Sequence, residues 1–387
     1  MLSGSQAINV YGTVTSYNTS ANAAGASFLN GTLTSGINIG NPGNENLKWE
    51  TTTQLNVGFD LGIFKNRLTL EADYFQKYTT DLLLSEPLPG YTGGGNIYRN
   101  IGEISNNGFE FSINGVIVDN SDFTWSANLN MSFMKNKIES LGTREFISQS
   151  GGAGAGMVNF PEMILKPGYP ISSYYGYRSL GIWQQDEAAT AAIYGNAPGD
   201  YHYEDWNGDN VINGSDFQII GSGIPTQIFG FNNTLKYKWL TLNAFFQSML
   251  GFDKWNFAYA QTMIAAADAR EYLHVDILDR WSPTNTGSKV AAFSKTNRQQ
   301  IQSSAYVEKG NYLRLKNLSL QFAFPKNWMK TINGSVQISG QNIWTLTKYK
   351  GLDPEAYSNV GPTDSRGADG GAYPNAKIWT FGLNLNF

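Results

Sequence analysis

The residues with the clearest chemical pattern lie in the stretch DWNGDNVINGSD. Asp205, Asn207 and Asp209 stand at alternate positions, followed by Val211 and then by Asp216 at the twelfth position. Side-chain oxygens at positions 1, 3 and 5, a backbone carbonyl at 7 and a carboxylate at 12 can surround one hard cation. The spacing therefore predicts a calcium site, whose role would be to stiffen the surrounding chain.

This stretch resembles the calcium loops of EF-hands and dockerins, with two departures. Position 6 is Asn210, where the loop normally has Gly for a sharp turn, although Asn also tolerates positive φ. Position 12 is Asp216 instead of Glu, which shortens the reach for bidentate coordination. The alternative is a surface turn in which Asn and Asp side chains bond to nearby backbone. An extracellular setting would favour calcium, because sites of millimolar affinity suffice there.

Other patterns give weaker indications of chemistry. The two histidines, His202 and His274, are far apart in the sequence, so a His-based metal site or a catalytic triad is not expected. GGAGAG at 151–156 lacks the context of a nucleotide-binding loop and is interpreted as a loop tip. The segment 258–280 has helix-forming composition with several charges, which favours a loop helix over a membrane anchor. Three aromatics suit stacking on sugar rings, although packing within a loop is the commoner reason for them: Trp183, Tyr194 and Trp206.

Composition excludes several classes of protein. Aromatic residues make up 14% of the chain and charged residues 15%, whereas about 25% are charged in ordinary soluble domains. No run approaches ~18 uninterrupted apolar residues, so no transmembrane helix is expected. A net charge of −4 without a basic stripe argues against nucleic-acid binding. The absence of Cys excludes disulfides and thiolate metal sites, and the N-terminus shows no signal peptide.

The elements that must position these residues are strands. In the C-terminal WTFGLNLNF the odd positions from Trp379 to Phe387 are apolar, and the even positions are polar or small. Successive strand side chains point to opposite faces, so one face is apolar and the other polar. The same alternation recurs in four predicted hairpins. Their turns are placed at Lys65-Asn66, near Asp119-Asn120, around Trp239 and at 325–327.

The connections between these strands are asymmetric. Turns on one side are short, whereas loops on the other side cover roughly 85–106, 139–226, 253–305 and 346–374. This asymmetry is typical of an outer-membrane barrel, and the polar face would line its lumen. A soluble β-sandwich also alternates, but its strands are usually nearer 5–6 residues long. The lumenal candidates are Glu71, Asp73, Glu110, Asn114 and Gln337.

Several stretches resemble the C-terminal barrel half of the SusC/RagA family of TonB-linked outer-membrane receptors. The resemblance runs from about residue 41 to the end. The stretches that carry it are NPGNENLKWETTTQLNVGFD, NRLTLEADYFQKYTTDLLL, NIGEISNNGFEFSING, DRWSPTNT, NYLRLKNLSLQFAFPKNW, SGQNIWTLTKYKGLDPE and YPNAKIWTFGLNLNF.

The resemblance implies an all-β fold, a transmembrane antiparallel barrel of which roughly ten strands are present, against 22 in plugged transporters. An open barrel would leave unpaired strand edges in lipid, so residues 41–387 are interpreted as the C-terminal part of a larger barrel. Residues 1–40 are interpreted as the remnant of an external loop. The resemblance also implies a plug and a TonB box, and the stretches of this chain that carry the resemblance include neither.

The implied function is uptake of a glycan, peptide or other nutrient across the outer membrane of a Gram-negative bacterium. The implied partners are a SusD-like surface lipoprotein, the TonB complex acting through the plug, and outer-membrane lipid. No enzymatic activity is expected. The alternatives are a passive porin or adhesin barrel and, third, an enzyme barrel. Phe387 is expected to anchor the last strand at the membrane interface and to contribute to barrel assembly.

Overall fold

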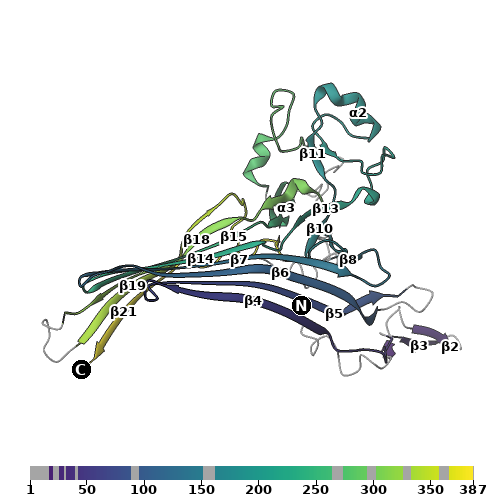
Figure 1. Ribbon diagram of the computed structural model, residues 1–387. Helices are drawn as coiled ribbons and strands as arrows, with labels where there is room; N and C mark the ends of the chain where they lie inside the picture. The colour runs from purple at the N-terminus through teal and green to yellow at the C-terminus, as the bar shows by residue number, and fades with distance from the viewer. Residues whose placement is uncertain are drawn as a thin grey trace.

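Nine long strands form one antiparallel sheet in the computed structural model, in the order β21-β19-β18-β15-β14-β7-β6-β5-β4 (Figure 1). The structure describes residues 17–20, 26–29, 32–39, 42–88, 96–150, 162–263, 273–293, 302–325, 333–356 and 366–386. The strands are β4 Thr51–Ile63, β5 Leu68–Pro87, β6 Asn96–Asp119, β7 Phe123–Ser140, β14 Gln227–Tyr237, β15 Leu240–Leu250, β18 Tyr312–Ala323, β19 Asn333–Thr347 and β21 Ile378–Asn386. The order of these strands in the sheet follows their order in the chain, as in an up-and-down barrel wall.

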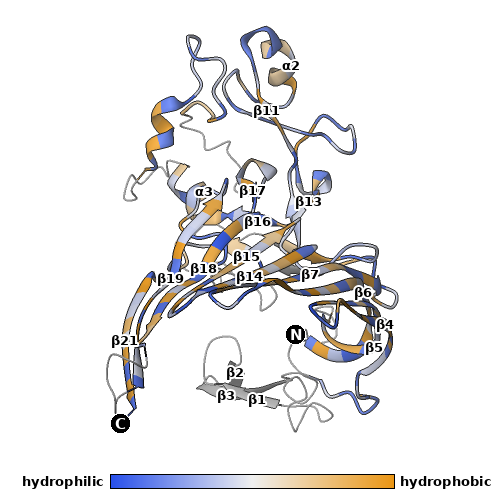
Figure 2. Cartoon of the chain, turned by 60° about the vertical axis from the view of Figure 1, so that its left-hand side comes forward, coloured by the Kyte–Doolittle hydropathy of each residue, from blue (hydrophilic) through white to orange (hydrophobic). Residues whose placement is uncertain are grey.

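The register separates an apolar face from a polar face, as the pairing of β4 with β5 illustrates. Val57 lies opposite Tyr74 on one face, whereas Gly58 lies opposite Asp73 on the other. We call the first the outward face and the second the lumenal face. Val57 and Phe59 are 60% and 57% exposed, so no described part of the chain covers the outward face of β4, as the second sheet of a β-sandwich would. Figure 2 shows the resulting alternation of hydrophilic and hydrophobic residues along the strands.

Short turns join the strands at one end of the sheet. Lys238 and Trp239 connect β14 to β15 with Tyr237 paired to Leu240, which confirms the tight turn predicted there. Lys238 adopts a φ of 50°, as a two-residue hairpin turn requires. The turn predicted at Lys65-Asn66 is longer than expected, because β4 ends at Ile63 and β5 begins at Leu68. Most of the turn between β18 and β19 lies outside the described residues.

The long connections at the other end of the sheet fold together into one unit, which we call the loop module (Figure 1). It comprises the described parts of 141–226, 251–311 and 348–377. Its strands are β8 Ile147–Ser150, β9 Glu162–Leu165, β10 Ser173–Gly176, β11 Ser179–Ile182, β12 Tyr201–Tyr203, β13 Gln218–Ser222, β16 Asp253–Asn256, β17 Val307–Lys309 and β20 Ala368–Asp369. Its helices are η2 Gln185–Glu187, α2 Ala188–Ile193, η3 Gly214–Asp216, α3 Phe257–Met263, η4 Val275–Asp279 and η5 Ser304–Tyr306.

The larger of the two buried apolar clusters among the described residues lies in the loop module. Tyr174, Trp255 and Tyr306 are at most 1% exposed and belong to one cluster with Phe257 and Trp281. Tyr174 packs edge-on against Trp255 with ring centroids 5.5 Å apart, and its hydroxyl donates to the carbonyls of Asp253 and Arg366. Segments from all three long connections therefore share one core, which fixes the loops relative to one another.

The described parts of residues 1–40 form a small sheet. They include β1 Tyr17–Ser20, β2 Ala26–Leu29 and β3 Thr32–Ile39, which form an antiparallel sheet in the order β1-β3-β2. Within the described part of the chain, no helix has the length and apolar character needed to cross a membrane.

Candidate lumenal and extracellular sites

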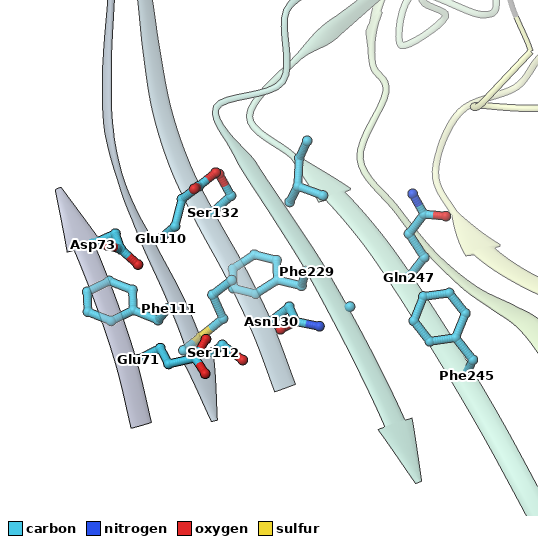
Figure 3. A pocket seen from close by; sticks show the side chains of 13 residues that line it. Glu71, Asp73, Glu110, Phe111, Ser112, Asn130, Ser132, Phe229, Phe245 and Gln247 are labelled. Carbon is cyan, nitrogen blue, oxygen red and sulfur yellow. The ribbon is translucent and has the colours of Figure 1, made fainter. Parts of the chain in front are cut away.

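A hollow of about 480 Å³ lies on the sheet where β5, β6, β7, β14 and β15 adjoin (Figure 3). Its polar side chains project from the lumenal face because of the strict alternation along each strand. Its lining residues are Glu71, Asp73, Glu110, Phe111, Ser112, Asn130, Met131, Ser132, Ile228, Phe229, Gly230, Phe245 and Gln247. The hollow thus combines carboxylates, hydroxyls and amides with the aromatic ring of Phe245.

Carboxylates dominate one side of this hollow. Asp73 lies directly opposite Glu110, and Glu71 lies opposite Asp60. Like charges in directly opposed positions destabilise a sheet, and no ion pair compensates them within the described residues. Ser132 donates a weak hydrogen bond to Glu110 at 3.4 Å. This wall can attract cationic groups and accept hydrogen bonds.

Closer to the short turns, the lumenal face is rich in amides, and Arg67 is the charged residue among those that line it. A smaller hollow of about 200 Å³ is lined there by the turn residue Asn66 and by Asn114, Asn128 and neighbouring side chains. Asn128 donates to Asn114, and Asn130 donates to Asn128 at 2.8 Å. Amide and hydroxyl groups of this kind exchange hydrogen bonds with water or a polar solute. The polar residues predicted for the lumen therefore lie on one continuous face.

The predicted calcium loop is exposed on the loop module and is closed by hydrogen bonds to Asp205. The Asp205 carboxylate accepts from the N–H groups of Gly208 at 2.7 Å, Asp209 at 3.2 Å and Asn210 at 2.8 Å. Asn210 has a φ of 63°, so Asn adopts the left-handed conformation that Gly normally supplies at position 6. Burial raises the pKa of the nearby Tyr194, and the charge of Asp205 raises it further.

The last predicted ligand has a different environment. Asp216 is fully buried, and its two carboxylate oxygens accept from the N–H groups of Trp206 at 3.0 Å and Asn213 at 2.8 Å. Asn213 and Asp216 form a capping box at the start of η3. Among the described residues, no three His, Cys, Asp or Glu side chains are grouped so as to hold a metal ion. In this conformation backbone N–H groups occupy the oxygens that a cation would need, Val211 is exposed, and the N–H of Val211 donates to Asp209 at 2.8 Å.

The aromatic residues considered for sugar stacking do not form one surface. Trp183 is 2% exposed and stacks on His202 with ring centroids 3.5 Å apart and on Tyr194 at 6.0 Å. Burial lowers the pKa of His202, which favours the neutral ring in this stack. Trp206, in contrast, is 63% exposed. Trp183 therefore serves the packing of the loop module, and only Trp206 offers a free ring face.

His274, the second histidine, precedes η4 as its N-cap residue. Its ring accepts a hydrogen bond from the N–H of Asp276 at 3.1 Å. The helical segment expected at 258–280 is divided into α3 and η4, with 264–272 outside the described residues. The glycine-rich segment 151–156 and the C-terminal Phe387 also lie outside the described residues.

A buried charge cluster in the loop module, linked to β18 by the ion pair of Asp353 with Arg314, was not among the predictions from the sequence. Lys254 of β16 is 1% exposed, and its ammonium donates to the carbonyl of Asp353 at 3.2 Å. It also lies 3.9 Å from the carboxylate of Asp369, which accepts from Tyr349 at 2.6 Å. Burial lowers the pKa of Lys254 against the opposing effect of the two aspartates. Arg314 lies in the stretch NYLRLKNLSL, in which apolar and polar residues alternate, so its position in the sequence does not mark it as a buried charge.

Comparison with protein families gives an extended match. A family model described as "TonB dependent receptor-like, beta-barrel" matches residues 5–343, so the similarity begins well before residue 41. TonB-dependent receptor P3 of Formosa agariphila is 38% identical, over 99% of this chain and 38% of its own length. Receptor P26 of the same organism is 33% identical, over 100% of this chain and 39% of its own length. TonB-dependent receptor SusC of Bacteroides thetaiotaomicron is 28% identical over 89% of this chain and 32% of its own. The chain thus spans well under half the length of these relatives.

Solved structures give the same fold. The structure titled RagAB peptide transporter superposes with a TM-score of 0.78 at 24% identity, covering 98% of this chain and 39% of that one. The RagAB peptide importer in the 'open-open' state gives a TM-score of 0.77 at 25% identity, covering 98% and 38%. The all-β prediction and the resemblance to the SusC/RagA receptors are both confirmed. The nine-stranded sheet corresponds to part of a larger barrel wall.

Proposed function

Because the chain belongs to the TonB-dependent receptor-like β-barrel family, we propose that it forms part of the wall of an energy-coupled outer-membrane receptor for nutrient uptake. The observation that carries this proposal is the division of the nine-stranded sheet into an exposed apolar face and a polar face. An apolar band suits lipid, and a polar face suits a hydrated lumen. The short turns and the large loop module lie at opposite ends of the sheet, as in outer-membrane barrels, whose periplasmic turns are short and whose extracellular loops are long.

In this proposal the sheet is a scaffold and the cargo passes along its lumenal face. Asn114, Asn128 and Asn130 present amides that exchange hydrogen bonds with a hydrated cargo at little net cost. The carboxylates of Glu71, Asp73 and Glu110 make the next level of the wall acidic. Force from the TonB complex would act on a plug within the barrel and not on these strands. The role is transport without catalysis.

The proposed cargo is an oligosaccharide or a peptide, and the proposed partner is a SusD-like surface lipoprotein over the loop module. Support comes from the similarity to SusC and from the fold shared with the RagAB peptide transporter. The neutral amides of the lumenal wall suit either cargo, because both present hydroxyl, amide or carbonyl groups. An exposed Trp206 is available for contact with a sugar or an aromatic side chain.

We also propose that Asp205, Asn207, Asp209, Val211 and Asp216 bind calcium in the extracellular medium. The left-handed Asn210 and the short bond from its N–H to Asp205 support this, since both belong to a tight loop with its first carboxylate turned inward. Binding requires Asp216 to exchange one backbone N–H partner for the cation. The ion would stiffen the surface of the loop module and take no part in chemistry.

Uptake in cells tests the main proposal. The gene for the complete receptor is deleted in its host, and entry of labelled oligosaccharides and peptides is measured with and without a functional TonB complex. We expect one cargo class to depend on both the gene and TonB, and the complemented strain to recover it. A passive porin would carry the cargo equally well without TonB, and that result would refute energy-coupled uptake. Replacing Glu71 and Asp73 by Gln and Asn then tests whether the acidic wall selects the charge of the cargo.

A further inference from the structure

Aromatic rings mark a level on the outward face near the loop module. Tyr74 and Phe109 have ring centroids 5.1 Å apart, and Phe133 and Phe229 lie 5.7 Å apart. Phe109 pairs directly with Phe133, so the four rings cross the neighbouring strands β5, β6, β7 and β14. Outer-membrane barrels carry such aromatic girdles at the two boundaries of their apolar band. This girdle therefore marks the membrane boundary on the side of the loop module.

Directly beyond the girdle the outward face becomes polar. Tyr78 and Ser105 stand four residues beyond Tyr74 and Phe109 toward the loop module, so alternation keeps them on the outward face. The Tyr78 hydroxyl donates to Glu103 at 2.5 Å. Ser105 donates to one carboxylate oxygen of Glu139 at 2.6 Å, and Lys137 donates to the other at 2.5 Å. We call these five residues, together with Lys135, the polar belt.

Within the polar belt both carboxylates already accept hydrogen bonds, whereas the ammonium groups of the two lysines can still donate to an anion. Glu103 and Glu139 already have donors. Lys135 is exposed and lies opposite Asn107; within the described chain it has no ion pair. Lys137 uses one of its three ammonium protons on Glu139. The two lysines stand on the same side of β7, roughly 7 Å apart along the strand.

We propose that Lys135 and Lys137 bind the phosphate of a phosphorylated glycolipid in the outer leaflet of the membrane. The proposal rests on the outer-membrane location in the proposed function. Both lysines lie on the lipid-facing side, just outside the girdle, where headgroups and not acyl chains meet the protein. An anionic headgroup attracts each lysine near the surface, and the internal bonds of Glu139 reduce its repulsion of a phosphate. The site would fix a lipid at the wall formed by β6 and β7.

Binding of a defined lipid to the complete, purified receptor tests this proposal. The probe is diphosphorylated lipid A, with dephosphorylated lipid A and phosphatidylglycerol as comparisons, and bound lipid is counted by native mass spectrometry. The double variant Lys135→Gln/Lys137→Gln should bind diphosphorylated lipid A at least tenfold more weakly, because each lysine contributes about fivefold. The matched control is Lys77→Gln, which removes a lysine from the lumenal face of β5 opposite Gln54 and should not change binding.

Charge-retaining variants separate a binding role from a folding role. Lys135→Arg/Lys137→Arg should keep the affinity of the wild type, and heat-resistant migration of each variant shows whether its barrel is folded. Unchanged binding in the folded Gln double variant overturns the proposal, and so does equal binding of dephosphorylated lipid A. Equal binding of phosphatidylglycerol overturns the assignment to a glycolipid. TonB-dependent uptake by the same variants is measured separately, so failure of the lipid site is distinguishable from failure of the transport proposal.

Discussion

Arg314 on β18 and Asp353, 39 residues later in the connection to β21, form an ion pair with only 4% of each side chain exposed. Asp353 also accepts from the N–H groups of Glu355 at 2.9 Å and Asn375 at 2.8 Å. A second contact of Arg314, to Glu355 at 2.6 Å, completes the attachment. The connection is therefore held against the barrel wall by largely buried charges, and it links the loop module to β18.

Replacing one partner of this pair should destabilise the folded receptor strongly. Asp353→Leu leaves the buried Arg314 guanidinium partly uncompensated, which should lower the free energy of unfolding by about 3 kcal/mol. The double variant Arg314→Met/Asp353→Leu removes both charges and should lose less than the sum of the two single losses. Thermal unfolding of the complete receptor in detergent, followed by Trp fluorescence, measures all three. Strictly additive losses would show that the two residues are not coupled.

The same pair should make the attachment sensitive to acid. Burial would raise the pKa of Asp353, but hydrogen bonds from Arg314 and from the N–H groups of Asn375 and Glu355 outweigh it and hold the pKa below its usual value. A lowered folded-state pKa stabilises the protein at pH values above the unfolded-state pKa, about 4. That stabilisation is lost as the pH falls through the folded-state value. Unfolding temperatures measured from about pH 5 to 2 should therefore fall less steeply for Asp353→Asn than for the wild type, and parallel curves would contradict this.

The two faces of β4 should differ in access to water. Asn56→Cys places a thiol on the lumenal face, whereas Val57→Cys places it on the outward face. In receptor reconstituted into a bilayer, a water-soluble maleimide should label Asn56→Cys several times faster. In the unfolded receptor the two rates should agree, which controls for intrinsic reactivity. Equal labelling in the bilayer would place both residues in water and remove the membrane assignment of this strand.

Calcium should stabilise the loop module if the Asp-rich loop binds it. We expect saturation at about 10⁻⁴–10⁻³ M, the range of extracellular modules, with a rise in unfolding temperature above that concentration. Asp205→Asn/Asp209→Asn should abolish the rise while keeping side chains of similar size. Asp186→Asn, in the nearby helix η2 but outside the loop, serves as the control. An equal calcium effect in both variants would leave the loop as a turn closed by its own N–H groups.

The long strands were predictable because one face meets lipid and the other meets water, so apolar and polar residues alternate along them. This alternation alone placed the turn at Trp239 and assigned Val57 and Asn56 to opposite faces. It did not predict the ends of β5 and β6, which extend into the segment 85–106 that was predicted to be a loop. There β5 contains register shifts between Thr79 and Leu83, and Asp81 has a φ of 56°, so alternation breaks off although pairing continues.

The loop module and its charge cluster could not be derived from the sequence for a different reason. Its core joins residues far apart in the chain, such as Tyr174, Trp255 and Tyr306. No pattern of neighbouring residues in the sequence indicates these contacts. Part of the lumenal hollow was predictable. The alternation along each strand placed its carboxylates on the polar face, but the position of Asp73 directly opposite Glu110 depends on the register between β5 and β6. Nothing in the sequence singled out Arg314, and its partner Asp353 was identified only from the tertiary structure.

A methyl group at Gly108 should disturb the barrel wall, although Gly108 lies within a regular strand. A Cβ built there would lie 2.2 Å from the carbonyl oxygen of Phe133 and 3.0 Å from the ring of Phe75. The first neighbour is backbone and cannot move without shifting β7, so Gly108→Ala should destabilise the wall by about 1–3 kcal/mol. Gly115→Ala is the matched control on the same strand, because its nearest new contact is an ordinary 3.6 Å. The amount of heat-resistant receptor in outer-membrane fractions should fall for Gly108→Ala and stay near wild type for Gly115→Ala. Equal yields for the two variants would show that β6 and β7 yield locally at Gly108.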